Sequence, residues 1–475
     1  MGTISVIQGA ALQNQYRALV LARGAEAKLT VKLSAHAGIR TERVRLARAG
    51  TEPLRAQLRA RGLAAYQLSA DRLLPERSYR FHFTDGRATA SSLDTYTLPA
   101  ALPREGTTIA VASCYYRGFN MGARLATSLR QNWLGVRPLL QFWVGDNLYA
   151  DVPSFGLFSG NAACEQTLDR YLEYFEHTAY GSARALTPNY TTYDDHEFWN
   201  NFPEPQPWLM RSMQGHAPGY TQAAHACLDL FQSSLNPPAV GQGRSFRFDL
   251  PPLSCFFLDV RSARTRYAHG RGTLLAPGDV EELQRWAREL EGPGVLALGQ
   301  PLWALPGGKT DYTPAAFTRE YRAIWAALVA APFDVLTIAG DVHHSRLLEL
   351  TTAANAGKIY EFVSSPASHI PSALGMLVHQ EAQVKSRLDV PRAIHAPGAQ
   401  LKARYFFGTR APNSIGLLRF VPRSGQTVDV DAAFIDYGGA RARIAAPAPI
   451  DLPPARHRMR ECKSAPAFTL GPRRR

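Results

Sequence analysis

The chain has 475 residues, of which 45% are hydrophobic and 19% are charged. This composition supplies apolar side chains for a large core and excludes a chain that is disordered as a whole. The length predicts two to three structural units, at roughly 100 to 200 residues each. The formal net charge of +14 lies at the ends, because residues 1–100 hold 15 Lys and Arg against 7 Asp and Glu, and residues 452–475 hold 7 against 1. Since residues 101–451 are then neutral, we expect no nucleic-acid partner.

The cysteines are odd in number and widely spaced, which argues against a disulfide framework or a zinc ribbon. They are Cys114, Cys164, Cys227, Cys255 and Cys462. The N-terminus lacks the basic start and apolar stretch of a secretory signal. No uninterrupted apolar run reaches the roughly 18 to 20 residues that cross a bilayer, so we expect no transmembrane segment. We therefore expect a cytoplasmic protein by default, or a periplasmic or secreted one if a signal lies upstream.

Residues 3–98 contain short segments of alternating apolar and polar residues, such as 27–33 and 78–83, separated by Gly and polar turns. This pattern predicts an N-terminal β-sandwich domain over residues 1–100. The segment LLPERSYRFHF is similar to the turn into a late strand of immunoglobulin-like or fibronectin-type modules, where an aromatic residue packs back on the chain.

From Thr107 onward, buried strands alternate with amphipathic helices, which indicates an α/β core over residues 101–451. The predicted strands are 107–114, 139–145, 254–260, 295–299 and 335–340, and the clearest helices are 168–180, 280–291 and 315–331. Three further segments beyond residue 400 are typical of an antiparallel meander that completes a second sheet. We expect the basic residues 452–475 to form a mobile tail.

Polar clusters directly follow several of these strands. Since the carboxyl ends of parallel strands meet at one edge of a sheet, we expect the clusters to converge there. Cys114 and Tyr116 end the first strand, although this pair taken alone more often indicates a buried Cys that acts as a small hydrophobe beside a packed Tyr. Asp146 follows Gly145 in a turn after the next strand; alone, this Gly-Asp-Asn sequence indicates no more than a turn.

The segment NYTTYDDHEFWNN places Asp194, Asp195, His196, Glu197 and Asn200 within seven positions, among several aromatic residues. Adjacent carboxylates repel one another, and a bound cation offsets that cost. A solvated acidic loop is the alternative, but the aromatic residues predict that this loop turns toward a core. Asp341, His343 and His344 follow the strand at 335–340, and carboxylate with imidazole is a donor pair that many metals accept.

The segment LDVRSARTR carries Asp259, Arg261 and Arg264. A guanidinium offers a planar fork of donors that matches phosphate oxygens, and Asp259 would hold that fork in place. A structural Asp with surface arginines explains the segment equally well.

Six segments, in chain order, resemble the alkaline phosphatase D (PhoD-like) family of the metallophosphatases. They are SCYY, GDNLYAD, DDHEFWNN, LDVRSARTR, LALGQPLW and GDVHHS. The resemblance covers roughly residues 107–437 and implies a four-layer αββα sandwich, an α/β fold preceded by the small β-sandwich, with a multinuclear metal site at the strand ends. In relatives from the wider superfamily the first of these motifs is Asp-x-His, whereas this chain has Ser113-Cys114-Tyr115-Tyr116 at that place.

The resemblance also implies roles for individual residues. Cys114 and Tyr116 would hold an Fe(III), Asp146 would bridge two metals, and Asp195 and Asn200 would serve a neighbouring calcium or other divalent cation. Asp341 and His343 would complete the ligands. His196 would act beside the phosphate as the catalytic histidine. From the residues themselves, we expect Arg261 to take part in catalysis by neutralising charge on the phosphoryl oxygens, and Arg261, Arg264 and His344 to bind substrate.

We therefore predict a metal-dependent phosphoesterase that hydrolyses a small phosphate-ester substrate by in-line attack of a metal-bound hydroxide. A phosphodiesterase or phospholipase using the same site is one alternative, and a non-catalytic binding protein on the same fold is another. The sequence leaves the oligomeric state and the choice between monoester and diester open.

Overall fold

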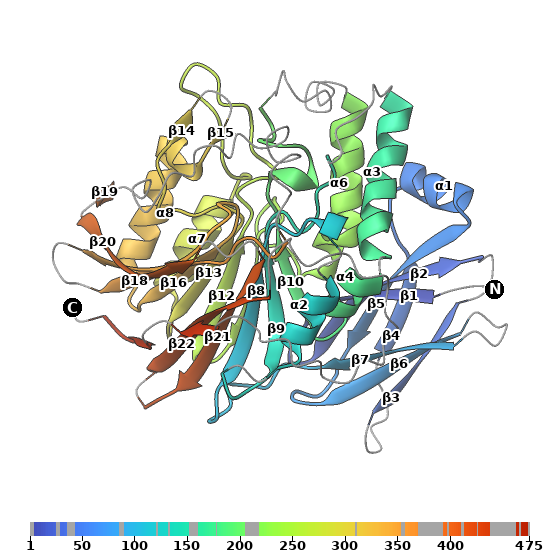
Figure 1. The fold of residues 1–475 in the computed structure, drawn as a ribbon, viewed down its shortest axis with the longest axis horizontal. Coiled ribbons are helices and arrows are strands. Elements are labelled where there is room, and N and C mark those ends of the chain that lie inside the picture. Colours follow the sequence, from blue (N-terminus) through green and yellow to red (C-terminus); the bar gives the residue numbers. More distant parts are fainter. Residues whose placement is uncertain are drawn as a thin grey trace.

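The fold is known from a computed structural model, drawn in Figure 1. The structure describes residues 4–24, 29–35, 43–84, 90–119, 122–131, 134–151, 160–176, 178–204, 218–308, 311–352, 357–368, 393–396, 399–409, 413–424, 426–437, 462–464 and 467–473. None of the helices over these residues is both long and apolar enough to span a membrane.

The N-terminal region is a sandwich of two antiparallel sheets, as predicted. One sheet has the order β1-β2-β5-β4 and the other β3-β6-β7. The strands are β1 (Ile4–Ala11), β2 (Gln15–Arg23), β3 (Thr30–Ala35), β4 (Arg43–Arg48), β5 (Leu63–Asp71), β6 (Ser78–Thr84) and β7 (Ala90–Tyr96), with helix α1 (Glu52–Ala60) between β4 and β5. In β6 the burial strictly alternates, which puts Tyr79, Phe81 and Phe83 in the core between the sheets.

The aromatic corner expected in this region is Tyr79. Its ring is buried, and its hydroxyl accepts a hydrogen bond from the Leu74 N–H at 2.8 Å. This contact ties the turn before β6 to the strand itself, so the predicted packing of an aromatic residue back on the chain is confirmed.

Two mixed sheets form the centre of the molecule. The first has the order β10-β9-β8-β21-β22-β23, with β24 also pairing with β22, and the second has the order β11-β12-β13-β16-β18-β17-β20-β19. The first contains β8 (Thr107–Ala112), β9 (Pro138–Val144), β10 (Asn189–Thr192), β21 (Ser414–Pro422), β22 (Val428–Asp436), β23 (Cys462–Ser464) and β24 (Phe468–Leu470). The second contains β11 (Phe246–Leu250), β12 (Leu253–Leu258), β13 (Gly294–Leu298), β16 (Val335–Ala339), β17 (Ser345–Thr352), β18 (Lys358–Val363), β19 (Ala393–Ala396) and β20 (Ala399–Thr409).

The two sheets pack face to face. Phe142 and Val144 of the first sheet share one core cluster with Phe257 and Ile338 of the second. Strands β8, β13 and β16 are buried along their whole length, because each is covered on both faces. Continuous apolar runs therefore marked these strands correctly in the sequence.

Helices cover the outer faces of both sheets. The helical elements after residue 101 are η1 (Arg117–Phe119), α2 (Gly122–Leu129), α3 (Gly160–Phe175), α4 (Thr178–Arg184), η2 (Asp195–Glu197), α6 (Pro218–Phe231), η3 (Ser233–Leu235), α7 (Asp279–Arg288), η4 (Pro314–Ala316) and α8 (Thr318–Ala330). Helices α2, α3, α4 and α6 pack on the first sheet around Trp143, and α7 and α8 pack on the second sheet around Phe256 and Leu298. Figure 1 shows the resulting four layers, with the N-terminal sandwich beside α3 and α6. The predicted αββα architecture is confirmed.

The N-terminal sandwich packs tightly on this core. Ile7 and Leu19, on the face of its first sheet that points away from the second, belong to the same buried cluster as Phe231 of α6 and Tyr171 of α3. The described strands of the sandwich end at Tyr96, and β8 begins at Thr107.

Three expectations from the sequence differ from the structure. The predicted helix 168–180 is two helices, α3 and α4. The meander expected after residue 400 is divided between the sheets: β20 pairs with β17 in the second sheet, whereas β21 and β22 form an antiparallel hairpin in the first. A run of three strands in the sequence does not state which neighbour each strand will find, because that choice depends on distant parts of the chain.

The mobile tail expected over 452–475 is the third difference. Residues 452–461 lie outside the described residues, but β23 and β24 pair with β22, and Phe468 and Leu470 are buried. Arg473 donates to the carbonyls of Leu328 and Val329 at the end of α8. These contacts hold the end of the chain, because a guanidinium near a helix C-terminus satisfies its last carbonyl groups.

Candidate metal centre

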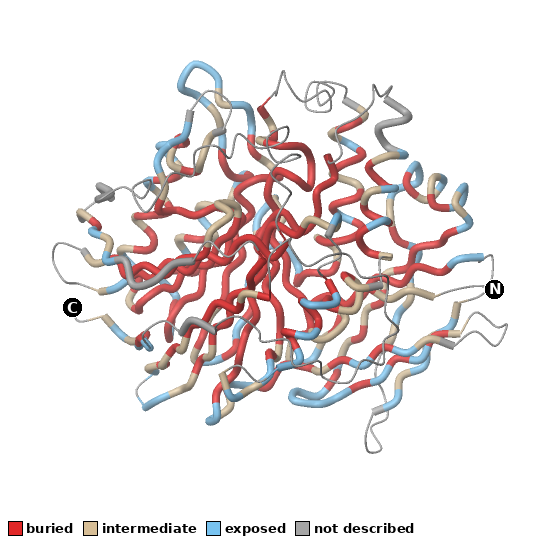
Figure 2. The backbone as a smooth tube through the Cα atoms, in the orientation of Figure 1, coloured by how far each residue is buried: buried red, intermediate tan, exposed pale blue. Residues whose placement is uncertain are grey.

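The predicted clusters meet at one edge of the double sheet, just beyond the ends of β8, β9, β10 and β16. This edge lies within the buried centre of the molecule (Figure 2). Cys114, Asp146, Asp341 and His343 follow these strands in the left-handed conformation, with φ of 53°, 51°, 69° and 49°. Residues other than glycine rarely adopt this conformation, and such strain gathers at functional sites, where the surrounding structure maintains it.

Two glycines let the sheets approach each other at this edge. A Cβ on Gly340 would lie 2.3 Å from the Val144 carbonyl oxygen and 2.5 Å from the Ser113 Cβ, across the two sheets. Gly145 has φ of +86°, and a Cβ there would lie 2.8 Å from the Cβ of Asp194 after β10 of the same sheet and 3.1 Å from the Cα of Gly299 after β13 of the other sheet. Only glycine therefore fits at these two positions, directly before Asp341 and Asp146.

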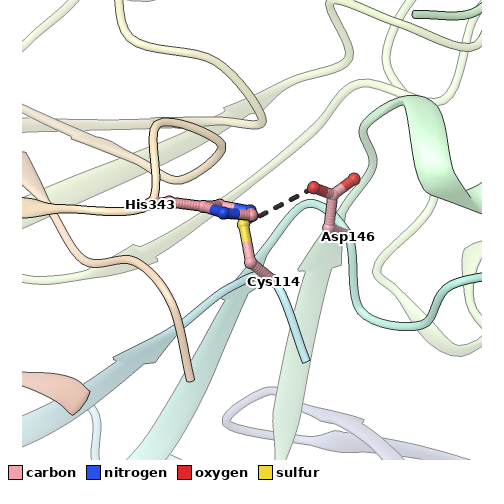
Figure 3. Close-up of side chains that lie close together, drawn as sticks. All are labelled: Cys114, Asp146 and His343. Atoms are coloured by element: carbon pink, nitrogen blue, oxygen red, sulfur yellow. Dashed lines mark hydrogen bonds between the residues drawn. The ribbon is translucent and has the colours of Figure 1, made fainter. Parts of the chain in front are cut away.

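Cys114, Asp146 and His343 form the first group of candidate ligands (Figure 3). Their donor atoms all lie within 4.8 Å of one another, and Cys114 Sγ is 3.5 Å from Asp146 Oδ2. Ser365 Oγ donates to Cys114 Sγ at 3.1 Å and accepts from the His343 N–H at 3.0 Å. Burial raises the pKa of the Cys114 thiol, and the nearby Asp146 carboxylate raises it further. A bound cation would favour the thiolate instead.

The phenol beside this first group belongs to Tyr149. Its hydroxyl lies 3.2 Å from His343 Nε2, and its ring centroid lies 4.2 Å from that of His196. Burial raises the pKa of Tyr149, with further contributions from Cys114 and Asp146. Tyr116, the phenol predicted from the sequence, is half-buried, and its ring packs edge-on against that of Tyr149 at 6.0 Å.

Asp146, Asp194, Asp195 and Asp341 form a second group of oxygen donors within 4.8 Å of one another. Burial raises the pKa of Asp146 and Asp194 well above the usual range, although His196 and Arg261 act in the opposite direction. Asp194 Oδ2 is buried and has no hydrogen-bond partner among the described residues. Buried carboxylates at such distances need a positive charge between them, so the chemistry of this group fits a cation.

Asp146 belongs to both groups, and to a third that consists of Asp146, Asp195 and His196. The structure brings together Asp146, Asp195, Asp341 and His343, which were expected to converge. It adds Asp194 and Tyr149, which the sequence analysis did not select as ligands. Their positions in the sequence could have indicated both residues, because Asp194 is adjacent to Asp195 and Tyr149 follows Asp146 by three residues.

His196 is oriented by Asp151. Its Nδ1 lies 2.8 Å from Asp151 Oδ1, and the other oxygen of Asp151 accepts from the backbone N–H of Asn200 at 2.9 Å. Burial alone would lower the pKa of His196, but the carboxylates of Asp151, Asp195 and Asp146 raise it well above its ordinary value. The pKa of Asp195 is lowered, because His196 and Arg261 outweigh the effect of its burial. Asn200 is buried beside this pair.

Glu197 supports the whole edge. Its two carboxylate oxygens accept hydrogen bonds from the backbone N–H groups of Asp146, Asn147 and Asp194 at 2.8 to 3.1 Å. This side chain therefore holds the turns after β9 and β10 in register with each other. Burial raises the pKa of Glu197 to about 8.

The guanidinium groups of the two arginines that were predicted to bind phosphate donate hydrogen bonds to other groups of the protein. Arg261 is 2% exposed, and its Nε donates to Asp194 Oδ1 while Nη1 donates to the Phe202 carbonyl. Arg264 Nε donates to Val260 O, Nη1 to Tyr312 O and Nη2 to Gln300 Oε1. Both differ from the open, substrate-facing fork that we expected, because buried carboxylates and carbonyl groups lie within reach of the guanidinium groups.

His344 is half-buried beside His343. Its Nδ1 lies 2.8 Å from the Val342 carbonyl, and its Nε2 lies 3.4 Å from Arg346 Nη1. Arg346 in turn pairs with Glu361 inside the second sheet. These contacts set the orientation of the His344 ring.

Comparison with known proteins identifies the fold. No family model matches the chain, and no curated protein matches it. Among solved structures, PhoD matches with a TM-score of 0.59 and 16% identity, over 91% of this chain and 86% of that chain. The purple acid phosphatase PPD1 from yellow lupin (Lupinus luteus) seeds matches with a TM-score of 0.52 and 10% identity, over 92% of this chain and 72% of that chain. The chain therefore has a PhoD-like metallophosphatase fold.

Proposed function

We propose that this chain is a metal-dependent phosphoesterase that hydrolyses small phosphate esters. The observation that carries the proposal is the buried carboxylate of Asp146, which three groups of metal-ligand side chains share at the strand ends of a metallophosphatase fold. Metal ions held there would activate water as the nucleophile and neutralise the charge that builds on the phosphoryl oxygens.

Two ions would be held by different residues. Cys114, His343 and Tyr149 would bind one of them, which we propose is Fe(III), because thiolate and phenolate donors suit that ion. Asp194, Asp195 and Asp341 would bind the other, for which calcium or another divalent cation is the matching choice because all donors are carboxylates. Asp146 would contact both. Asn200, which is buried and whose backbone N–H bonds to Asp151, would contribute its side-chain oxygen to the second ion.

His196 would act on the leaving group. Asp151 holds its Nδ1, so the ring keeps one orientation and Nε2 is the nitrogen that serves the substrate. From that position His196 would orient or protonate the leaving oxygen. Arg261 would act indirectly, since its positive charge offsets the carboxylates of Asp194 and Asp195.

An aryl phosphate assay with metal analysis tests the proposal. The purified chain would be stripped with a chelator, reloaded with iron plus a divalent ion, and assayed with an aryl phosphomonoester and an aryl phosphodiester. We expect turnover to disappear on stripping and to return on reloading. Equal turnover with and without metal, or a fully loaded chain that hydrolyses neither ester, would overturn the proposal, and the second result would favour a binding protein. Metal analysis of the purified, active chain before stripping is a separate check, and a preparation that contains only zinc would remove iron from the proposal.

A further inference from the structure

Gln300 follows β13 at the same edge of the second sheet and contacts a candidate ligand. The side chain is 1% exposed. Its Nε2 donates to Asp341 Oδ2 at 3.1 Å, and its Oε1 accepts from Arg264 Nη2 at 2.6 Å. One buried amide therefore joins a guanidinium to a carboxylate of the second ligand group.

The chemistry of the partners decides the orientation of this amide. A guanidinium has donors only, so the amide oxygen must face Arg264, and an ionised carboxylate has acceptors only, so the amide NH₂ must face Asp341. A flipped amide would put two donors together at one end and two acceptors at the other. Arg264 thus determines which end of Gln300 reaches Asp341.

Arg264 is itself held by contacts with residues outside the ligand groups. Its Nε and Nη1 donate to the carbonyls of Val260 and Tyr312 at 3.1 and 2.9 Å, and its guanidinium lies 5.1 Å from the centroid of the Phe317 ring. Tyr312 belongs to β15 (Asp311–Tyr312), which pairs with β14 (Gly307–Gly308) in a short hairpin. The position of Gln300 therefore depends on a series of contacts that lie outside the metal site.

We propose that Gln300, oriented by Arg264, is a positioning residue that holds the Asp341 carboxylate for metal binding. The backbone of Asp341 is held in the left-handed conformation after Gly340, and the rotation of its side chain then decides where the carboxylate points. The hydrogen bond from Gln300 restricts that rotation before the ion arrives. Outer hydrogen bonds of this kind to ligating groups are worth roughly 10- to 100-fold in metal affinity. The inference rests on the metal site of the proposed function and does not depend on turnover.

Titration of the metal-free full-length chain with Co²⁺, followed by calorimetry and by the visible spectrum of the bound ion, tests this role. We expect Gln300→Leu, which keeps the volume and removes both hydrogen bonds, to weaken Co²⁺ binding roughly 10- to 100-fold. Arg264→Met should weaken binding by a smaller factor, because Gln300 remains but loses its fixed orientation. Asp341→Ala is the positive control for loss of a ligand.

Gln141→Leu is the matched control. Gln141 is also a buried amide, and it donates to Ala183 O and Thr187 Oγ1, away from the ligand groups. We expect it to lower the melting temperature and to leave Co²⁺ affinity unchanged. If Gln300→Leu does not fold, Gln300→Met replaces it, since the unbranched thioether has a similar length but no donor for Asp341 and adds no charge to the site. Gln300→Met should also bind Co²⁺ more weakly.

Three results would overturn the positioning role. In the first, the Gln300 variants bind Co²⁺ as tightly as the wild-type chain, although Asp341→Ala binds it weakly. In the second, Gln300→Leu and Gln141→Leu lose the same amount of Co²⁺ affinity. In the third, the wild-type chain binds no Co²⁺. Failure of the proposed function looks different. A chain that binds Co²⁺ with the predicted dependence on Gln300, but hydrolyses no phosphate ester, keeps the positioning role and loses the activity.

Discussion

The two groups of candidate ligands share Asp146 but differ in every other donor. On one side lie the thiol of Cys114, the imidazole of His343 and the phenol of Tyr149. On the other side lie only the carboxylates of Asp194, Asp195 and Asp341. Sulfur, nitrogen and phenolate donors favour a transition metal, whereas carboxylate oxygens favour a hard cation. The difference teaches that one buried carboxylate separates two sets of donors with unlike chemistry, which is why the proposed function assigns two different ions to them.

The side chains that support the two groups differ in charge, as the donors themselves do. The thiol side is supported by a neutral hydroxyl, that of Ser365, which bonds to Cys114 and to the backbone of His343. The carboxylate side is supported by the Arg261 guanidinium and by the Gln300 amide. The protein therefore supplies positive charge where four carboxylates gather, and it needs none where the donors carry less charge.

Replacing the shared carboxylate should have the largest effect. Asp146→Asn keeps the size of the side chain but removes its charge, so we expect both ions to bind more weakly and turnover of an aryl phosphate to fall by roughly 1000-fold. Metal content and turnover are the measurements. Asp249→Asn, an exposed position in β11, should change neither. Retention of both ions with normal turnover in Asp146→Asn would contradict a shared ligand.

Removing one donor from each group comes next. We expect His343→Ala and Asp341→Ala each to lower turnover by at least roughly 100-fold, and the double variant to lose little more, because residues that act as a unit are not additive. Steady-state kinetics of the three variants under identical metal loading measures this. If the loss of turnover in the double variant equals the product of the two single losses, the two groups work independently and form two separate sites.

The two phenols should then be distinguishable by their spectra. In the iron-loaded chain we expect Tyr149→Phe to remove the visible phenolate-to-Fe(III) absorption and to lower turnover by about 10-fold, because its hydroxyl lies beside His343. Tyr116→Phe should keep the band. The reverse result would return the ligand role to Tyr116, the phenol selected from the sequence.

The smallest expected effect concerns the pH dependence of stability in the metal-free chain. Burial raises the pKa of Asp146, Asp194 and Glu197, for Glu197 from 4.5 to about 8, so the folded state binds protons that the unfolded state has released. The contribution to stability is present below pH 4.5 and is lost as the pH rises toward about 8. We expect the melting temperature to fall by several degrees over this range, and less steeply in Glu197→Gln. Bound metal should flatten the slope, and a melting temperature that rises with pH would contradict the sign.

Much of the fold was predictable because the strands of the central sheets are short, continuous and apolar. The predicted strands at 107–114, 139–145 and 335–340 match β8, β9 and β16 closely. Each is buried on both faces, so nearly every residue in it must be apolar. The convergence of Asp146, Asp195, Asp341 and His343 was predictable for a related reason, since parallel strands deliver the residues that follow them to one edge.

Other features were not predictable, because the partner of a side chain depends on residues far away in the sequence. Arg261 has the sequence context of a phosphate-binding residue, yet Asp194, 67 positions away, accepts its hydrogen bond. Arg264 has the same context, yet it holds Gln300. Nothing local distinguishes a guanidinium that faces substrate from one that faces a buried carboxylate, because both need the same planar fork.

The sequence by itself determined the alternation of strands and helices, the positions where strands end and the kinds of donor that follow them. Those features depend on local apolar patterning and on turn residues such as Gly145 and Gly340, so they can be seen in a few neighbouring positions. Only the tertiary structure decided which donors lie close enough to share an ion, which phenol faces His343 and which arginines are paired with carboxylates or carbonyl groups. These are distances between strands in two different sheets, and a shift of one pleat or one rotamer would change the partner without changing any local pattern.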